Sequence, residues 1–215
     1  MGQTLTYSHK IFETPTEADA KAIILVAEGG MTTEERWRKE TPYLAGLLGE
    51  TLALQAGDLV VDFGCGLGRI AKALIERYGC FVLGVDIAEK MRGLAPAYVA
   101  QPQFSIVSPE TFRRMVAGGL RCDAAIAVWV LQHCYDPGAE LDLIGAGLRP
   151  GGKLAVANLS FRSVPTVEGV WGRDDIDVRA ETLARFAQLE EGLFDEAAVG
   201  QSVFNTCYWA TYQKA

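Results

Sequence analysis

The chain has 215 residues, enough for one α/β domain with a short extension, and its 49% hydrophobic and 22% charged residues are ordinary for a globular protein. The formal net charge is -7, and the longest basic cluster is only Arg36, Arg38 and Lys39. Proteins that bind nucleic acid usually carry a basic stripe or patch, so we expect no nucleic-acid partner.

The first part of the chain predicts helices and no strand. Thr16 is a candidate N-cap for a first helix. Thr41-Pro42 predicts a fresh helix start, because proline is favoured at the first helical position. We therefore divide the chain into an N-terminal helical extension or lid, residues 1–55, and a main domain, residues 56–215.

A glycine-rich loop follows the first predicted strand. The apolar run that begins at Leu59 reads as a buried parallel strand, and Asp62 stands at its carboxyl end. Gly64, Gly66 and Gly68 then turn the chain into a predicted helix. Ligands of doubly wound sheets bind at the carboxyl ends of the strands, and glycines let the backbone approach a ligand closely. We expect the binding site here.

Two interpretations of this loop compete. A dinucleotide site needs G-x-G-x-x-G/A, but the third slot holds Arg69, and the Asp62 carboxylate would repel a pyrophosphate. An acidic group suits a ligand that carries an amino group instead. The residues Asp62, Gly64, Gly66 and Gly68 match E/D-x-G-x-G-x-G completely. This resembles the first motif of class I S-adenosylmethionine-dependent methyltransferases.

The second predicted strand ends in another carboxylate. Asp86 follows an apolar run, and such a residue can accept both hydroxyls of an adenosine ribose. The string from Gly84 to Met91 resembles the family pattern G-x-D-x-S-x-x-M, with Ala88 in place of the usual serine. The alternative for Asp86 is a capping or solvated side chain. After the third strand, Ser108 stands where many members carry Asp, so its hydroxyl is the candidate for the adenine.

The fourth predicted strand, residues 122–131, is the most apolar and should be central. By the resemblance, Val128 and Trp129 end beside the methionine part of the cofactor. Val130-Leu131-Gln132-His133 resembles the W/x-V-L-x-H segment of many small-molecule methyltransferases. His133 is either a base that takes a proton at neutral pH or a residue that orders the loop.

The end of the chain predicts the end of the sheet. Leu148 to Leu154 resembles the family's L-x-P-G-G-x-L turn into a fifth strand. We expect a helix over 180–190 and then two strands, 193–203 and 205–212. The expected fold is therefore α/β: doubly wound, with a seven-stranded mostly parallel sheet, an antiparallel last strand, and helices on both faces.

The resemblance implies a methyl transfer from S-adenosylmethionine to a nucleophilic O, N or C of a small-molecule acceptor, with His133 as the catalytic candidate. The implied cofactor-binding residues are Asp62, Gly64, Cys65, Gly66, Gly68, Asp86, Ile87, Ser108, Val128 and Trp129. The implied acceptor-binding residues are Trp37, Tyr43, Phe161, Trp171 and Arg173, while Met31 is a further lid candidate and Arg162 a further candidate for an acidic acceptor.

Absent motifs narrow the acceptor. The place after the fourth strand reads Val-Trp-Val-Leu and not the D/N-P-P-Y/F of enzymes that methylate nucleic-acid amino groups. No cysteine follows a proline, as cytosine C5 enzymes require, and no acidic metal cluster is evident. A small molecule is the remaining default. The alternatives are a regulatory protein that binds S-adenosylmethionine without transferase activity and, behind it, a nicotinamide-dependent oxidoreductase.

Compartment and assembly are less constrained. The five cysteines are odd in number and none form C-x-x-C, so we expect reduced thiols and no metal site. The first residues lack a basic region followed by an apolar core, and no apolar run reaches the roughly 20 residues of a membrane helix. We expect a cytoplasmic protein without a membrane partner, as a monomer or homodimer.

Overall fold

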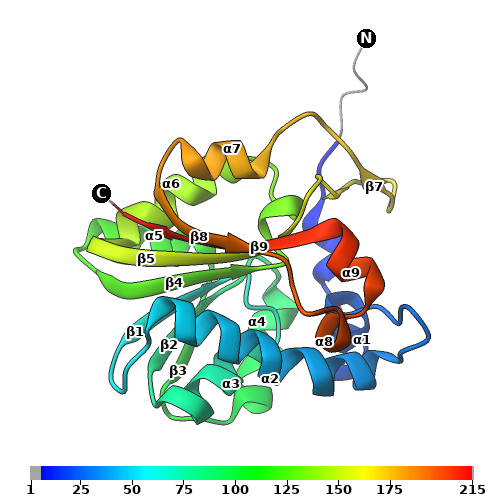
Figure 1. Ribbon diagram of the computed structural model, residues 1–215, viewed down its shortest axis with the longest axis horizontal. Coiled ribbons are helices and arrows are strands. Elements are labelled where there is room, and N and C mark those ends of the chain that lie inside the picture. The colour runs from blue at the N-terminus through cyan, green and yellow to red at the C-terminus, as the bar shows by residue number, and fades with distance from the viewer. Residues whose placement is uncertain (1–5, 215) are drawn as a thin grey trace.

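Seven strands form the main sheet of the computed structural model, in the order β3-β2-β1-β4-β5-β9-β8 (Figure 1). The structure describes residues 6–214. The strands of this sheet are β1 Leu59–Phe63, β2 Phe81–Val85, β3 Phe104–Val107, β4 Cys122–Val128, β5 Leu148–Leu159, β8 Ala187–Gly192 and β9 Cys207–Gln213. A separate two-stranded ribbon pairs β6 Val164–Pro165 with β7 Trp171–Gly172.

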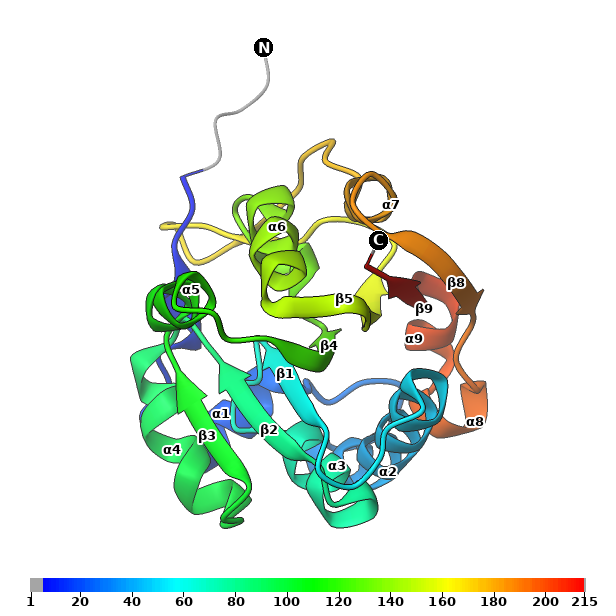
Figure 2. The same cartoon turned by 90° about the vertical axis from the view of Figure 1, so that its left-hand side faces the viewer.

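Helices cover both faces of the sheet (Figure 2). The helical segments are η1 His9–Phe12, α1 Glu17–Ile24, α2 Thr33–Leu52, α3 Arg69–Tyr78, α4 Glu89–Val99, α5 Pro109–Ala117, η2 Leu131–His133, α6 Pro137–Gly147, α7 Val178–Leu183, α8 Glu196–Val199 and α9 Gln201–Thr206. One core cluster joins α2 and α3 to one face, and a second joins α5, α6 and α7 to the other. The predicted doubly wound architecture is confirmed.

The strand directions create the ligand-binding edge. β1 pairs in parallel with both β2 and β4, so the chain reverses its direction of travel across the sheet at β1. Such a switch point opens a crevice at the carboxyl ends of the strands on either side. β9 is antiparallel to β5, as predicted for the last strand.

The elements between β7 and β9 differ from the prediction. The segment expected as helix 180–190 forms most of the short α7 and then the start of the edge strand β8, whereas the segment expected as strand 193–203 forms α8 and the first half of α9. Helix formers such as Gln188 and Glu190 favour a helix locally, but pairing with β9 decides the outcome. The helices that replace the expected strand bury Val199 and Val203 in the core.

The expected helix start at Thr41-Pro42 is also wrong, because α2 continues through Pro42 without interruption. A proline inside a helix removes one backbone hydrogen bond and usually costs about 3 kcal/mol. Burial on both sides of the proline offsets this cost, with Trp37 before it and Leu44 after it. Leu44 belongs to the same core cluster as β1, so this helix packs as part of the main body.

Among residues 6–214, no helix combines the length and the apolar composition needed to cross a bilayer.

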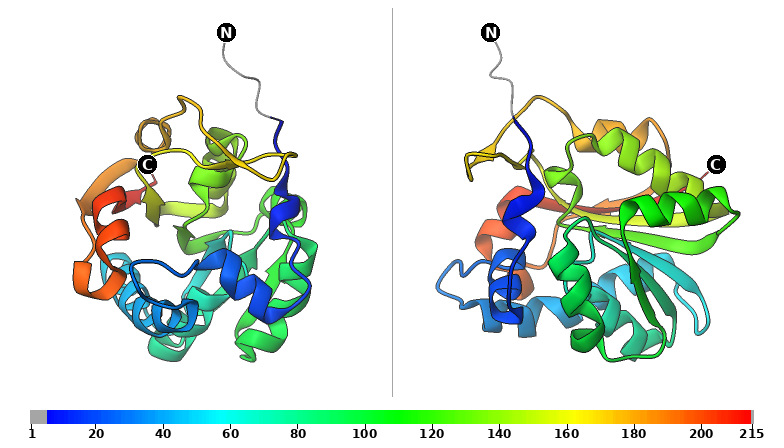
Figure 3. Two further views of the ribbon diagram at one scale, coloured as in Figure 1. Left: turned by 90° about the vertical axis from the view of Figure 1, so that its right-hand side faces the viewer. Right: turned by 180° about the vertical axis from the view of Figure 1, so that it is seen from behind.

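The N-terminal segment before α1, residues 6–16, contacts the β6–β7 ribbon and α4 (Figure 3). Ser8 N donates to Pro165 O at 3.0 Å. Further along, the Glu13 carboxylate accepts hydrogen bonds from the first backbone N–H groups of α4, at 2.9 Å each. A carboxylate at a helix N-terminus is favoured by the unpaired N–H groups there. The segment therefore bridges two parts of the molecule that are far apart in sequence.

Candidate functional site

A cavity opens at the carboxyl ends of β1, β2 and β4. Most of the residues expected to bind the cofactor line it, and so does the catalytic candidate: Asp62, Gly64, Cys65, Gly66, Asp86, Ile87, Val128, Trp129 and His133. The wall is completed by residues from the N-terminal segment, α1 and α6. The glycine loop, the second carboxylate and the end of the central strand therefore meet in one place.

The glycine loop is shaped by steric need. Gly64 has a φ of 76°, and a Cβ added there would lie 2.2 Å from Cγ2 of Val130. Gly66 has a φ of 53°, and its backbone N–H donates to Oδ2 of Asp86 at 2.8 Å. Both positions combine a left-handed backbone with a close neighbour, which glycine alone tolerates well. The loop is thereby held against the end of β2.

Asp62 is a buried carboxylate with unused capacity. It is 2% exposed, and its Oδ2 has no hydrogen-bond partner among the described residues. Burial raises its pKa to about 7, with the charge of Asp86 adding to the rise and Arg69 opposing it. An unpaired buried carboxylate is costly, so its position in a cavity wall indicates a cationic or hydrogen-donating ligand.

Asp86 has both structural and binding capacity. Its Oδ1 accepts from Ala88 N at 2.9 Å, while Oδ2 holds the loop at Gly66 N. Burial raises its pKa, and these two backbone bonds oppose the rise. Each carboxylate oxygen has a second acceptor site, so two ligand hydroxyls can still be bound.

His133 lies on the other side of the cavity in a fixed tautomer. Its Nδ1 donates to Ser163 O at 2.5 Å, which leaves Nε2 as the acceptor, 3.2 Å from Nε2 of Gln132. Burial lowers its pKa to about 4, and the nearby Arg162 also lowers it. The imidazole is therefore neutral near pH 7. The rings of Trp171 and Phe12 pack against it at centroid distances of 4.9 and 5.8 Å.

Trp129 carries backbone strain at the end of β4. Its φ is 56°, which is uncommon for a bulky residue. A backbone hydrogen bond from Trp129 N to Ala157 O, at 2.8 Å, stabilises this conformation. The indole ring also packs on Phe194, at a centroid distance of 5.4 Å. Its indole N–H is buried without a partner among the described residues. Strained residues of this kind gather at functional sites.

Comparison with known proteins supports the same reading of this cavity. Residues 61–156 match the family model described as "Methyltransferase domain". This stretch of the chain is similar to a methyltransferase domain. The matched segment runs from β1 into β5 and contains the glycine loop, Asp86 and His133.

The curated proteins and solved structures that are similar to this chain include several methyltransferases. The chain is 32% identical over 106 residues to the ubiquinone biosynthesis O-methyltransferase of Methylobacterium sp. (strain 4-46), which is 49% of this chain and 42% of that protein. The chain therefore covers less than half of that relative's length. Magnesium protoporphyrin IX methyltransferase from Synechocystis PCC 6803, solved with bound SAH, has a TM-score of 0.65 at 17% identity and covers 96% of this chain and 97% of its own. The N-methyltransferase NodS from Bradyrhizobium japonicum WM9 has a TM-score of 0.59 at 17% identity and covers 85% and 87%. These structural similarities show the fold.

Two residues expected at the cofactor do not line the cavity. Gly68 is the N-cap of α3, where its φ of 79° and the nearby Val99 side chain require glycine. Ser108 caps α5: its Oγ accepts from Thr111 N at 3.1 Å. Both positions are structural in this conformation.

Most residues expected at the acceptor also lie elsewhere. Trp37 is buried and donates through Nε1 to the Tyr98 hydroxyl at 2.8 Å, and the Tyr43 hydroxyl accepts from Asp195 N at 2.8 Å. The guanidinium of Arg173 stacks on Phe161 at 4.2 Å, away from the cavity.

Three more expected residues have clear positions. Arg162 is buried in an ion pair with Asp174. Met31 approaches Lys39, and Trp171 alone among the acceptor candidates borders the site.

Sequence reasoning missed the residues that close the cavity. The N-terminal segment contributes Tyr7 and Phe12, α1 contributes Ile24, and α6 contributes Glu140. No motif marks them. The one usable signal was the predicted placement of residues 1–55 over the cofactor, which named other side chains of the same region.

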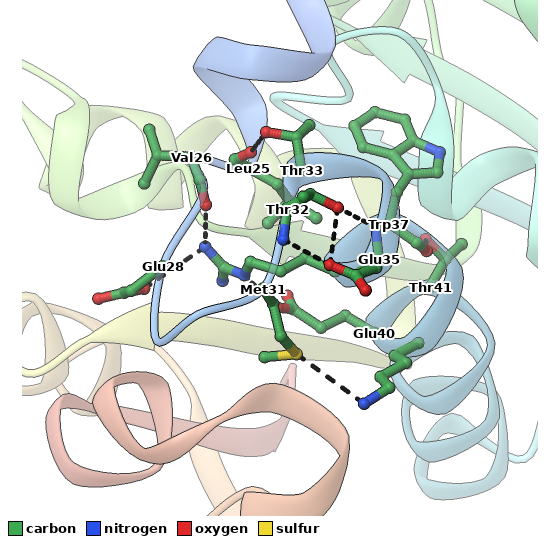
Figure 4. A network of polar contacts seen from close by, with 12 residues as sticks. Leu25, Val26, Glu28, Met31, Thr32, Thr33, Glu35, Trp37, Glu40 and Thr41 are labelled. Carbon is green, nitrogen blue, oxygen red and sulfur yellow. Dashed lines mark hydrogen bonds and ion pairs between the residues drawn. The ribbon is translucent and has the colours of Figure 1, made fainter.

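A network of polar contacts, part of it buried, joins the first half of α2 to the segment before it (Figure 4). Arg36 is 4% exposed and pairs with the fully buried Glu40 at 2.6 Å, while its Nη1 donates to Val26 O at 2.7 Å. Arg69, in the cavity wall, donates to the Thr41 hydroxyl at 3.2 Å. Burial lowers the pKa of Arg69 to about 10, and the charge of Glu40 opposes that shift. The network thereby connects α2 to the start of α3.

Proposed function

We propose that this chain transfers a methyl group from S-adenosylmethionine to a nucleophilic atom of a small-molecule acceptor. The observation that carries the proposal is the unpaired, buried Asp62 carboxylate beside the glycine loop and Asp86, in one cavity. The donor set suits the two polar ends of S-adenosylmethionine. Fold alone would not be sufficient, because one fold serves many chemistries.

The residues fit the cofactor at both ends. The cofactor's amino group is a cationic donor, and Asp62 Oδ2 is an acceptor in the cavity wall with no hydrogen-bond partner among the described residues. The ribose hydroxyls suit the remaining acceptor sites of Asp86. Ile87 and Met91 supply apolar walls near Asp86. The two negative charges also favour the positively charged sulfonium, whose methyl group is already activated for displacement.

The protein's task is then to align the acceptor, exclude water and receive a proton. For a hydroxyl acceptor, we assign the proton to Nε2 of His133, since Nδ1 is held by Ser163 O. When bound, S-adenosylmethionine would supply an activated methyl group to the acceptor oxygen, and the imidazole would take the proton that the hydroxyl loses. Phe12 and Trp171 form an aromatic wall beside His133 that keeps water out.

Oxygen is the acceptor atom that the relatives favour. Two relatives that match about half of this chain are named as ubiquinone biosynthesis O-methyltransferases. The apolar and aromatic surroundings of His133 support a small, largely uncharged acceptor. The chain's net charge of -7 does not favour a nucleic acid.

Calorimetric titration with S-adenosylhomocysteine tests the proposal, with NAD as the control ligand. We expect micromolar binding of the first and none of the second. Binding of NAD alone would replace the proposal with a nicotinamide-dependent oxidoreductase. A chain that binds S-adenosylhomocysteine but consumes no S-adenosylmethionine with any phenol, amine or carbon acid would instead be a regulatory binding protein.

A further inference from the structure

The wall of the cavity has a carboxylate that the sequence motifs do not mark. Glu140 lies in the first turn of α6 and contributes to the cavity wall. Its Oε2 is buried, and no described residue offers it a hydrogen bond. A buried carboxylate oxygen without a partner is costly, so a donor from a ligand would relieve it.

Ser108, the residue expected to contact the adenine, already hydrogen-bonds at the N-terminus of α5. Its hydroxyl oxygen accepts from Thr111 N and lies 3.1 Å from the Thr111 hydroxyl. The side chain does not line the cavity, whereas the next residue, Pro109, does. Proline offers no N–H, so this side of the cleft presents little that could hydrogen-bond to a base edge.

Glu140 lines the same cavity as Asp86 and Pro109. The charges of both carboxylates raise the pKa of Tyr7 and of Cys134, after the larger effect of burial. Tyr7 and Cys134 therefore lie within electrostatic reach of both. Neither carboxylate is among the groups that shift the pKa of the other. An adenosine that binds Asp86 through its ribose extends its base into the same cavity.

We propose that the Glu140 carboxylate accepts a hydrogen bond from the exocyclic amino group of the adenine and makes the site selective for adenosine over inosine. This rests on the proposed function, because it assumes that S-adenosylmethionine occupies the cavity. The chemistry is discriminating: adenine presents an amino donor where hypoxanthine presents a carbonyl acceptor. A carboxylate attracts the first and repels the second.

The test uses two probes, S-adenosylhomocysteine and S-inosylhomocysteine, titrated calorimetrically into the full chain. The variant is Glu140→Gln, whose amide can donate to the hypoxanthine carbonyl and can also accept from the adenine amino group. Glu110→Gln is the matched control, because Glu110 is also in the first turn of a helix beside the cleft but is exposed and pairs with Arg114.

The measured quantity is the ratio of the two affinities, which does not depend on the fraction of folded protein. A hydrogen bond to a charged group contributes about 1.5–3 kcal/mol, or roughly 10- to 150-fold. We expect the wild-type chain and Glu110→Gln to prefer the adenosyl probe by at least about tenfold. Glu140→Gln should reduce that preference to about threefold or less, chiefly by stronger binding of the inosyl probe.

Two results would overturn the assignment, and they can be told apart. A wild-type chain that binds neither probe contradicts the proposed function itself. A wild-type chain that binds S-adenosylhomocysteine, with a preference unchanged by Glu140→Gln, leaves the proposed function standing and removes Glu140 from the adenine.

Discussion

The two halves of the cavity are built in different ways. The proposed cofactor half comes from the ends of adjacent parallel strands, with Asp62 near the end of β1 and Asp86 directly after β2. The proposed acceptor half comes from the N-terminal segment and the loop after β4, which are far apart in sequence, and Trp171 of the β6–β7 ribbon packs on His133 beside it. A motif of contiguous residues can describe the first half. The second half exists only when the chain has folded.

The two halves also differ in charge. The cofactor half buries two carboxylates whose pKa values are raised, chiefly by burial. The acceptor half surrounds His133 with aromatic rings, and burial lowers the pKa of that imidazole to about 4. One half therefore suits a cation and the other a neutral ligand.

Removal of the imidazole should have the largest effect. For His133→Ala we expect turnover of a hydroxyl acceptor to fall about 10²- to 10⁴-fold, the usual range for a lost acid–base group. Calorimetry should show unchanged affinity for S-adenosylhomocysteine, because the cofactor half is intact. Equal losses of turnover and cofactor affinity would mean that His133 orders the loop instead.

The amide variant Asp62→Asn should weaken S-adenosylhomocysteine binding by roughly 10- to 150-fold, because the ligand's ammonium loses a charged partner. Affinity of the wild-type chain should also fall as the pH drops below about 7, where Asp62 becomes protonated. In Asp62→Asn that pH dependence should disappear. If the variant keeps the wild-type slope, another group binds the ammonium.

The same carboxylate should affect stability in the opposite direction. The folded-state pKa of Asp62 is about 7, above its ordinary value of 3.8, so the folded chain retains a proton that the unfolded chain loses. Stability from this group is present at low pH and is lost as the pH rises from about 4 to 7. Without ligand, Asp62→Asn should therefore have a higher Tm than wild type at pH 8. A lower Tm would mean that contacts of the Asp62 carboxylate in the ligand-free chain offset the free-energy cost of its burial.

Truncation of the aromatic wall should have a moderate effect. In Trp171→Ala, loss of packing on His133 and Phe12 should raise the acceptor KM about 2- to 12-fold, since aromatic pairs contribute roughly 0.5–1.5 kcal/mol. The matched control is Phe161→Ala, another exposed aromatic that lies away from the cavity and should leave KM unchanged. Similar changes in both variants would place the acceptor along the surface between them.

The smallest effect should follow Trp37→Phe. This change removes the hydrogen bond to the Tyr98 hydroxyl and should cost about 0.5–1.5 kcal/mol of unfolding free energy in urea titrations. Steady-state kinetics should stay within about twofold, because Trp37 does not line the cavity. A large rise in acceptor KM would mean that Trp37 contributes to acceptor binding.

The sequence alone determined the centre of the molecule. Asp62, Gly64, Gly66 and Asp86, which line the cavity, were identified because strand ends and positive-φ turns constrain residue type locally. The seven-stranded, mostly parallel sheet and its antiparallel last strand β9 also agree with the prediction. Local chemistry was a sufficient guide wherever one residue type satisfies a backbone requirement.

Tertiary structure alone decided the rest. β8 forms where the chain favours a helix, since pairing with β9 outweighs a weak local preference. Tyr7, Phe12 and Glu140 reach the cavity because distant segments pack there, whereas Trp37 and Tyr43, which looked suitable, are used in core contacts. Aromatic and acidic residues meet many kinds of environment, so their type does not reveal their place. Only the packing of segments around the sheet assigns it.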